Sequence, residues 1–565
     1  MLRKALGLFL INKLLVFIVL LGTTVWSSTM IRSGISYPFG IGFWGPNGHD
    51  GIWHIALANN LAKGLLENPV FADENIKNYH IGFDLLLAIL HKVTTIPVSV
   101  LYFQTLPPIF AILIGILTYW FVIKWRNSQL EALWATVFVY FSGGLGFIIT
   151  YLKDGVITGE SMFWSQQSVS TLINPPFVLS LIFILSGLIA LQKKNILLGI
   201  LFFGVLIQIK AYAAILVLGG LFVSTIYSYI LHHTSDILKV FMGSLVLNLL
   251  LFSLIKNDGI STFVWQPMWF LETMMSYSDR LGWERFYSAM TTYKMGHIWI
   301  KGFIAYFVAF VIFLLGNMGL RVVGFYFLCK SKIDNILIFL VVLVLMAITI
   351  PMFFVQKGTP WNTIQFFYYY LFFFSIFAGI ATSWIKSNVK YLAFFIFAIF
   401  GAWSTLQHYL PKMPQSFISK DEIEALDFLS NQSDGIIFSY PFDIYKATEA
   451  VKNPPRPLYF YDSTSYVSAF SEKQSFEEDE VNLNIMGYDW KSRREETLSF
   501  VSNLDVYKGR KFLDSNDIKY LYLVKENSPL QGELLKLGST ELGLSKIFEN
   551  KGYIIYEYGK DFGSN

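Results

Sequence analysis

The sequence predicts an α-helical polytopic membrane protein with a small C-terminal α/β soluble domain. Of the 565 residues, 54% are apolar and only 15% are charged, and the mean hydropathy is +0.50. A soluble domain is usually about 25% charged, and a single core rarely grows beyond about 300 residues. The chain contains one cysteine, Cys329, so no intramolecular disulfide can form. A single soluble globule, a disordered chain and a disulfide-stapled fold are therefore excluded.

The distribution of charge divides the chain near Leu410. Residues 1–410 carry 25 Lys and Arg and 14 Asp and Glu, whereas residues 411–565 carry 18 and 25. We therefore expect a membrane domain over 1–410, which includes a long first external loop at 27–97, and an acidic α/β domain over 411–565. No basic cluster or reader motif indicates a nucleic-acid partner.

About eleven transmembrane helices are expected, because a span needs about 20 apolar residues. The break inside 195–231 is placed at Lys210, which interrupts a long apolar run. The first span follows Arg3 and Lys4 and has no clear cleavage site, so it is not interpreted as a signal peptide. The expected spans are 5–26, 98–123, 128–151, 171–191, 195–209, 212–231, 236–256, 302–325, 335–355, 363–385 and 389–409.

Charge in the short loops predicts the orientation of the chain. Loops rich in Lys and Arg face the cytoplasm, and in the eleven-span pattern these loops all fall on the side of the N-terminus. Because the number of spans is odd, the C-terminal domain is expected to be extracytoplasmic, together with the long loops at 27–97 and 257–301. We expect a multi-pass protein of the plasma membrane, with the lipid bilayer as one partner.

Two segments of the first external loop, 50–66 and 80–92, are apolar but too short to span a bilayer. Both are expected to be helices that lie at the membrane surface. In 50–66, one apolar stripe is predicted opposite Asn59, Asn60 and Lys63. The stripe consists of Trp53, Ile55, Leu57, Leu61 and Leu65.

The C-terminal domain is predicted to alternate helices and strands. Acidic residues in the first turn favour a helix at 420–430, and a second helix is expected at 509–517. Short β-like runs at 435–440, 518–524 and 553–558 favour strands. This alternation is typical of a small layered α/β domain.

The most distinctive polar motif is His49-Asp50-Gly51-Ile52-Trp53-His54, on a turn that runs into a helix. One interpretation makes Asp50 a helix N-cap. The other makes it a carboxylate at the water–membrane boundary that accepts a proton from a hydroxyl or amide nucleophile. His54 follows four residues later, on the same helix face.

A first span, an Asp-containing turn, the helix at 50–64 and an apolar interfacial helix together resemble the GT-C glycosyltransferases. This superfamily includes the protein O-mannosyltransferases, the aminoarabinose transferase and the oligosaccharyltransferases. The resemblance covers the architecture of nearly the whole chain, whereas residue matching is confined to the first loop. In the superfamily the first-loop Asp is the catalytic acid/base, which here falls on Asp50. Many members have Asp-Glu where this chain has Asp-Gly, which leaves His49, His54 or Asp84 to substitute.

The resemblance implies transfer of a sugar from a polyprenyl phosphate or diphosphate to an acceptor outside the cytoplasm, commonly with inversion. Cations must stabilise the anionic leaving group, and one carboxylate suffices for a single inverting displacement. The sequence leaves open whether the acceptor is a protein, a lipid or a glycan, and it does not identify the sugar. No cofactor is firmly implied. Whether the reaction needs a divalent cation stays open, because in this superfamily diphosphate-oligosaccharide donors require one and monophosphate donors generally do not.

Lys210, with Tyr212 beside it, is the candidate for binding the donor phosphate, because an ionisable residue inside apolar sequence is costly. The alternative is a lysine that snorkels from a helix end. Arg280 and Arg285, in the loop at 257–301, are second candidates, with solvated loop charges as the alternative.

The segment 356–365 is a polar, turn-rich break between two very apolar spans. An aromatic ring together with amide donors is typical of a sugar-binding site. The alternative is that Trp361 only anchors the chain at the membrane interface. Trp164, Gln166 and Gln167 are expected to line the cleft that holds the substrates. Asp154 and Glu160 are poor evidence for a metal site, and no metal ligand is assigned. The candidate sugar- and acceptor-binding residues are His49, His80, Asp84, Lys357, Trp361, Asn362 and Gln365.

Three other functions are compatible with the sequence. A polytopic transporter or lipid flippase would also place charge inside the membrane, but many transporters contain an internal repeat, and none is found here. A polymerase or ligase of surface polysaccharide would not need the two surface helices. A non-catalytic scaffold is the remaining alternative.

Overall fold

The computed structural model describes residues 2–232, 235–255, 263–502, 505–526 and 542–559. The chain forms two compact units, which are treated separately below. Unit 1 comprises Met1–Met30, Leu106–Leu254 and Thr262–Pro411. Unit 2 comprises Ile31–Thr105, Ile255–Ser261 and Lys412–Asn565. The segment 31–105 and the C-terminal segment therefore belong to the same compact unit.

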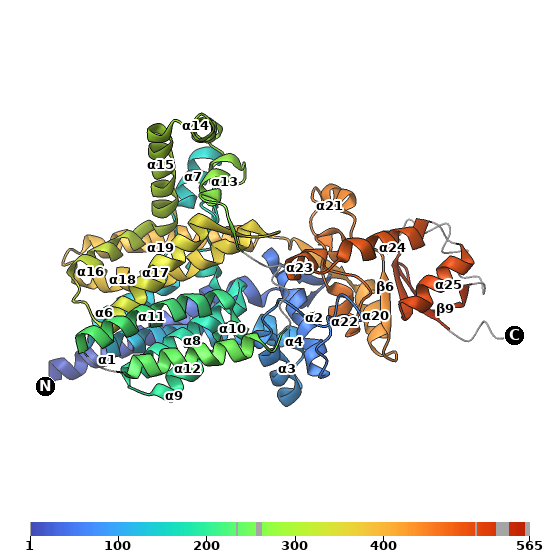
Figure 1. Cartoon of the computed structure of the whole chain (residues 1–565), viewed down its shortest axis with the longest axis horizontal. Coiled ribbons are helices and arrows are strands. Elements are labelled where there is room, and N and C mark those ends of the chain that lie inside the picture. The colour runs from blue at the N-terminus through green and yellow to red at the C-terminus, as the bar shows by residue number, and fades with distance from the viewer. Residues whose placement is uncertain (1, 233–234, 256–262, 503–504, 527–541, 560–565) are drawn as a thin grey trace. The chain divides into compact units, whose positions relative to one another are not determined.

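Unit 1 is almost entirely helical, and Figure 1 shows α8, α11, α12, α17 and α18 running roughly parallel to one another. A two-stranded sheet pairs β3 with β4, antiparallel. The elements of unit 1 are α1 (Leu2–Ile31), α5 (Leu106–Arg126), α6 (Gln129–Phe141), α7 (Gly146–Asp154), η3 (Ser168–Ile173), α8 (Pro175–Gln192), α9 (Ile196–Gly204), α10 (Leu206–Ile209), α11 (Ala211–His232), α12 (Asp236–Phe252), β3 (Phe263–Trp265), α13 (Trp269–Ser276), α14 (Glu284–Met295), α15 (Trp299–Met318), η4 (Gly319–Val323), α16 (Gly324–Lys330), α17 (Asn335–Phe353), β4 (Phe354–Gln356), η5 (Pro360–Ile364), α18 (Gln365–Trp384) and α19 (Val389–Tyr409).

Among the described residues, nine helical segments are long and apolar enough to cross a membrane. The prediction of a polytopic helical protein is thus confirmed, with nine candidate spans among the described residues beside the about eleven that the sequence predicts. The expected spans at 195–209 and 236–256 form shorter helices, at Ile196–Ile209 and in the 17-residue α12. These helices are at or below the short end of the range for a transmembrane helix, about 17–25 residues. Residue 256, at which the expected span 236–256 ends, lies outside the described residues.

Helix α18 is the core helix of unit 1. In the segment Pro360–Trp384, 89% of the most apolar window is buried. The helix packs against α6, α16 and α17. Gly379 allows the closest approach, because a Cβ there would lie 2.4 Å from the Cα of Ala135 on α6. The polar segment just before α18 is therefore attached to the most firmly packed helix of this unit.

Unit 2 combines two sheets with short helices. The first sheet has the order β1-β2-β5-β7, and the second has the order β6-β8-β10-β9. The elements of unit 2 are β1 (Ile35–Tyr37), β2 (Gly40–Phe43), η1 (Gly45–Gly48), α2 (Asp50–Ala62), α3 (Gly82–Thr94), α4 (Val98–Val100), η2 (Leu101–Thr105), β5 (Ser416–Ser419), α20 (Lys420–Ser430), β6 (Ile436–Ser439), α21 (Ile444–Ala450), β7 (Arg456–Pro457), η6 (Leu458–Phe460), α22 (Tyr466–Ser471), α23 (Glu480–Met486), α24 (Trp490–Ser502), α25 (Val506–Ser515), β8 (Ile518–Val524), β9 (Leu544–Glu549) and β10 (Tyr553–Tyr558).

The first sheet joins the segment 31–105 to the C-terminal segment. Strand β2 pairs antiparallel with β5, with Gly40 opposite Ser419 and Phe43 opposite Ser416. At Gly40, where φ is +128°, a Cβ would lie 1.9 Å from the carbonyl oxygen of Ile418, so only glycine fits. This pairing fixes the chain that leads into α2.

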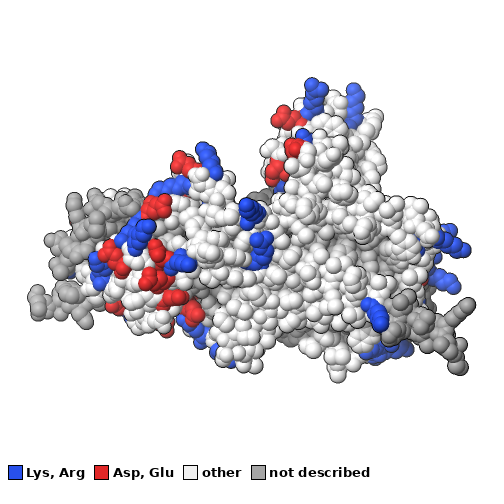
Figure 2. Space-filling model, turned by 180° about the vertical axis from the view of Figure 1, so that it is seen from behind, with Lys and Arg blue, Asp and Glu red and all other residues white. Residues whose placement is uncertain are grey.

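The second sheet confirms the predicted α/β character of the C-terminal segment. The predicted strands at 435–440, 518–524 and 553–558 correspond to β6, β8 and β10, and the helix at 420–430 is α20. Strand β6 runs parallel to β8, and β10 is antiparallel to both β8 and β9. Figure 2 shows charged side chains gathered on the C-terminal segment, whereas broad areas of unit 1 carry none on that face.

Helix α2 is not the surface helix that the sequence predicts. Every residue from Gly51 to Leu61 is buried, so the predicted polar side is covered as well as the apolar side. The amide of Asn59 donates a hydrogen bond to the carbonyl oxygen of Ala469 (3.0 Å), and that of Asn60 donates to Glu67 (2.7 Å). The C-terminal segment, which periodicity cannot reveal, supplies part of this cover.

Helix α3 does present an apolar face to its surroundings, as an interfacial helix requires. Leu85, Ile89 and Val93 are four residues apart and are 43%, 51% and 77% exposed. Side chains at this spacing share one helix face. An exposed apolar face therefore occurs on α3 and not on the helix at 50–66, for which the sequence predicts the stripe. The placement of α3 at the membrane surface stays a prediction.

Arg321 is fully buried inside unit 1 and links four of its segments. A guanidinium group has five N–H donors, and all five are used, with acceptors on the C-cap of α6, on η3 and its N-cap, on α15 and on α18. The acceptors are Ser375 Oγ (2.9 Å), Gln167 Oε1 (2.8 Å), the carbonyl of Asn317 (3.1 Å), the carbonyl of Ser142 (2.9 Å) and Ser168 Oγ (3.0 Å).

We predict that Arg321→Lys destabilises unit 1 strongly, although it keeps the charge, because three ammonium donors cannot reach five fixed acceptors. Each buried acceptor left unpaired costs about 1–3 kcal/mol. The melting temperature of the purified protein should fall by several degrees. Lys386→Met, at an exposed position, is the control and should leave it unchanged. Equal melting temperatures for Arg321→Lys and the parent protein would contradict this assignment.

Candidate functional site

The turn η1 delivers Asp50 to the start of α2. Gly48 lies so close to β5 that a Cβ there would be 2.3 Å from Ser416 Oγ. The N-cap of α2 is His49, whose side chain makes no capping hydrogen bond, and Asp50 is the first residue of the helix. The structure therefore does not use Asp50 as the N-cap residue, which was the alternative interpretation of its position.

The imidazole of His49 lies between two carboxylates. Its Nδ1 is 2.9 Å from Asp50 Oδ1, and its Nε2 is 3.3 Å from Oδ1 of Asp479, in the C-terminal segment. The Asp479 side chain is fully buried, whereas that of Asp50 is 57% exposed. His49 thus links an accessible carboxylate to an inaccessible one.

The charge on His49 follows from these neighbours. Burial by itself would lower the pKa of the imidazole, but Asp479 and Asp50 outweigh burial and raise the pKa well above its ordinary value of 6.5. His49 is therefore a cation at neutral pH. It compensates the buried Asp479 and leaves Asp50 as the solvent-facing carboxylate of the group.

His54 is held by a different carboxylate. Its Nδ1 lies 2.6 Å from Asp84 Oδ1, and its ring stacks on Tyr102 with 5.5 Å between the ring centroids. Burial raises the pKa of Asp84, and the neighbouring His54 opposes that shift. His80 precedes α3 and stacks on Tyr79. Asp84 therefore orients the His54 imidazole.

A chain of polar side chains in unit 1 brings together three of the predicted residues. Tyr212 Oη and Asn362 Nδ2 both donate to Gln356 Oε1, at 3.0 Å each. Gln365 Nε2 donates to Asn362 Oδ1, and Asn174 Nδ2 donates to Gln365 Oε1 at 3.2 Å. We call this set, Asn174, Tyr212, Gln356, Asn362 and Gln365, the amide network.

Lys210 lies next to the amide network. It is extended between α10 and α11, which confirms the predicted break in the apolar run. Lys210 is only 7% exposed, and its Nζ lies 5.7 Å from the centroid of the Tyr212 ring. A buried ammonium group of this kind does not match a lysine that snorkels into water.

The other predicted cations and rings lie in different surroundings. Trp361 is 52% exposed and Lys357 is exposed, as an interfacial anchor and a solvated lysine would be. The Arg280 guanidinium stacks over Trp164 at 4.5 Å, and its Nη1 donates to Ser161 Oγ at 3.3 Å. Arg285 is exposed on α14.

Gln166 and Gln167 line a small pocket in unit 1, of about 310 Å³ including the space at its mouth, together with Arg321 and Tyr368. Glu160 is buried and accepts hydrogen bonds from Gln167, Ser170 and Thr405. Asp154 is exposed. In the part of the chain that the structure describes, no three His, Cys, Asp or Glu residues are grouped so that they could hold a metal ion.

Sequence reasoning missed Asp479, Gln356, Asn174 and Arg321 as members of these groups. Asp479 lies in an acidic run within an acidic segment, so its composition gave no signal. Gln356 belongs to the polar break that was singled out, and Asn174 is also a helix N-cap. Arg321 could have been found, because an arginine inside an apolar span is unusual.

We predict that His49 stabilises unit 2 in a pH-dependent way. Because its pKa is raised on folding, this stabilisation is fully present below about pH 6.5 and is lost as the pH rises through the folded value. Each pKa unit corresponds to about 1.4 kcal/mol. The melting temperature should therefore exceed that of His49→Gln most at pH 6, and the difference should shrink at alkaline pH.

The control is His91→Gln, since His91 Nδ1 contacts the carbonyl oxygen of Ile96 (2.8 Å) instead of a carboxylate. Its melting-temperature difference should stay flat with pH. A His49→Gln difference that is equally flat would show that the two carboxylates do not hold a charged imidazole.

Comparisons with known proteins give structural neighbours only, since neither a protein-family model nor a curated protein sequence matches the chain. The structure is similar to the oligosaccharyltransferase AglB of Archaeoglobus fulgidus in complex with an inhibitory peptide and a dolichol-phosphate. That alignment has a TM-score of 0.45 and 9% identity, and it covers 97% of this chain and 74% of AglB. The apo form of the same enzyme gives a TM-score of 0.46 with the same coverage and identity.

A second neighbour is ArnT of Cupriavidus metallidurans bound to undecaprenyl phosphate. Its TM-score is 0.37 and its identity 10%, over 97% of this chain and 99% of ArnT. AglB and ArnT are both GT-C membrane glycosyltransferases, the superfamily that the first-loop residues resemble. The structural neighbours of this chain thus include two members of that superfamily.

Proposed function

We propose that this chain is a membrane glycosyltransferase that moves a sugar from a polyprenyl-phosphate donor to an acceptor on the extracytoplasmic side of the plasma membrane, with inversion. The observation that carries the proposal is the position and the exposure of the Asp50 side chain. Its carboxylate begins a buried helix and contacts His49, yet more than half of its surface is exposed. A carboxylate that is held in place and accessible is suited to accept a proton from a substrate.

The reaction is a single displacement. As the acceptor oxygen or nitrogen forms its bond to the anomeric carbon, the bond from that carbon to the phosphate oxygen breaks and the electron pair leaves with the phosphate. The proton of the acceptor moves to Asp50. One carboxylate suffices for this inverting step, whereas a retaining reaction would need a nucleophile as well.

His54 is the proposed second catalytic group. Asp84 holds its Nδ1, which fixes the orientation of the ring and supports a proton at that nitrogen. The chain has glycine where many members of the superfamily have a second carboxylate, and His54 is one turn along the same helix. It would assist proton transfer at the acceptor.

Lys210 is proposed to stabilise the leaving phosphate, because a buried ammonium group interacts strongly with a developing anion. The amide network beside it offers donors and acceptors for sugar hydroxyls, with Asn362 and Gln365 as the predicted contacts. The excess of Lys and Arg in the opposite loops supports an extracytoplasmic location for these groups.

We predict that Asp50→Asn lowers transfer by about 10²–10⁴-fold, the usual contribution of general base catalysis. The assay uses the full-length protein in lipid nanodiscs with synthetic undecaprenyl-phosphate-linked hexoses, and it measures the release of undecaprenyl phosphate. Asp489→Asn is the matched control, because Asp489 is an exposed carboxylate at the start of another unit 2 helix, α24. It should retain full activity.

Unchanged turnover in Asp50→Asn would remove Asp50 from the reaction. Movement of a lipid or solute tracer across vesicles, lost in Lys210→Gln and kept in Asp50→Asn, would instead establish a transporter or flippase.

We predict that Lys210→Gln lowers kcat by about 10²–10³-fold, because a cation that stabilises the leaving group acts mainly in the transition state. The KM for the donor should change less than kcat. Lys332→Gln, which changes an exposed lysine, is the control. A rise in KM with unchanged kcat would assign Lys210 to ground-state binding alone.

A further inference from the structure

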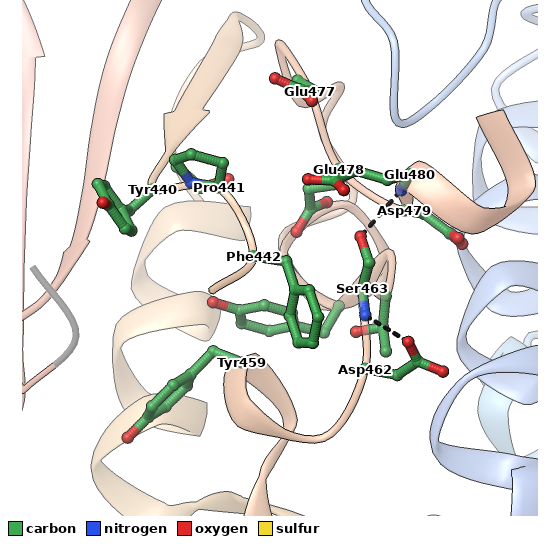
Figure 3. Close-up of a pocket in the computed structure, with 13 residues that line it drawn as sticks. Tyr440, Pro441, Phe442, Tyr459, Asp462, Ser463, Glu477, Glu478, Asp479 and Glu480 are labelled. Atoms are coloured by element: carbon green, nitrogen blue, oxygen red, sulfur yellow. Dashed lines mark hydrogen bonds between the residues drawn. The ribbon is translucent and has the colours of Figure 1, made fainter. Parts of the chain in front are cut away.

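Unit 2 contains a pocket of about 400 Å³, including the space at its mouth, whose lining is strongly acidic. It lies between the segment after β6 and the turn before α23 (Figure 3). Five carboxyl groups line it, from Asp462 and from residues 477–480, and no Lys, Arg or His is found among the described residues of the lining. This composition disfavours an anionic ligand such as a lipid phosphate.

Asp462 accepts a hydrogen bond from the backbone N–H of Ser463 (2.9 Å), and three more of the five carboxyl groups also have structural partners. Glu478 accepts two main-chain and two hydroxyl hydrogen bonds. Asp479 caps α23 and contacts His49, and Glu480 forms an ion pair with Arg494. These three groups hold the walls of the pocket in place.

Glu477 and Thr464 differ from these groups. Each is only 5% exposed, yet both carboxyl oxygens of Glu477 and the hydroxyl of Thr464 have no hydrogen-bond partner among the described residues. Buried polar atoms are almost always paired, so an unpaired carboxyl and an unpaired hydroxyl in one pocket require an explanation. A ligand with hydrogen-bond donors would satisfy both.

Aromatic rings complete the pocket. Tyr440, Phe442, Tyr459 and Tyr466 belong to its lining, and Figure 3 labels the first three. Aromatic faces attract cations, and an ammonium group donates three hydrogen bonds. We propose that this pocket binds a primary ammonium group, with Glu477 as its counter-ion, Thr464 as a hydrogen-bond acceptor and the rings as its walls.

Protonation of Glu477 would be coupled to binding. Burial, with a smaller effect of Glu480, raises its pKa to about 8, although Arg494 and Arg493 oppose the shift. Glu477 is therefore largely protonated at pH 7, and an ammonium ligand would displace that proton. Affinity should rise with pH up to about 8. Glu478, with a pKa of about 7, is another acid of the lining that titrates in the same direction. Burial also raises the pKa of Asp462 and that of Glu480, although Arg494 opposes the shift of Glu480.

The ammonium group could belong to an amino sugar or to a lysine side chain, and the experiment separates the two. Full-length protein is titrated calorimetrically with glucosamine against glucose, and with Nα-acetyl-lysine methylamide against its norleucine analogue. We expect at least one ammonium probe to bind about tenfold or more tightly than its neutral partner. The pair that shows this preference identifies the source.

Variants locate the site. Glu477→Gln should remove the preference for the ammonium probe and the proton release that accompanies binding, as measured in buffers of different ionisation enthalpy. Thr464→Val should weaken binding of the ammonium probe several-fold. If Glu477→Gln does not fold, this variant tests whether the probe binds in this pocket. Glu495→Gln, an exposed acid on α24, is the control for the change in net charge and should bind as the parent does.

Equal binding of the charged and neutral probes would overturn the proposal, as would a preference that survives both Glu477→Gln and Thr464→Val. Binding is measured without donor or transfer. Loss of the glycosyltransferase proposal would therefore leave this site standing, and loss of this site would leave Asp50 as the proposed base.

Discussion

The burial of α2 is the constraint on which the candidate site in unit 2 depends. The helix has no exposed side between Gly51 and Leu61, and part of its cover comes from residues about 400 positions later in the chain. Leu483, Met486 and Tyr488 share a hydrophobic core with Trp53 and Leu57, and α22 packs on α2. The pairing of β2 with β5 aligns the two segments. Asp50 is therefore positioned by the C-terminal segment as much as by its own loop.

Charge in unit 2 is organised around this packing. Burying Asp479 requires a cation, and His49 supplies it at the point where α2 begins. The same imidazole reaches Asp50, so one protonated side chain couples a structural carboxylate to the accessible one. His54 and Asp84 form a second pair of an imidazole and a carboxylate one turn further along, in which the Asp84 side chain is fully buried. The acidic run at 477–480 thus supports the candidate base through Asp479 and lines a pocket through Glu477.

In unit 1, polar groups lie among apolar helices and must form hydrogen bonds with partners inside the protein. Arg321 does this with five hydrogen bonds that join the ends of several helices. The amide network does it with a chain of side chains that begins at Tyr212 and ends at Asn174. Since α18 is the most deeply buried long helix described, Gln365 at its start is held by a rigid element. Lys210 lies at the edge of this ordered polar region.

The sequence by itself determined the features that depend on local pattern. Apolar length and charge identified a polytopic helical body, the α/β character of the last segment and the break at Lys210. It also singled out His49, Asp50, His54, Asp84 and the polar break before α18. Only the tertiary structure decided which of these side chains meet: His49 with Asp479, His54 with Asp84, and Tyr212 with Gln356. The physical reason is that such pairs join residues far apart in the chain, and neither helical nor strand periodicity records a contact that is formed by folding.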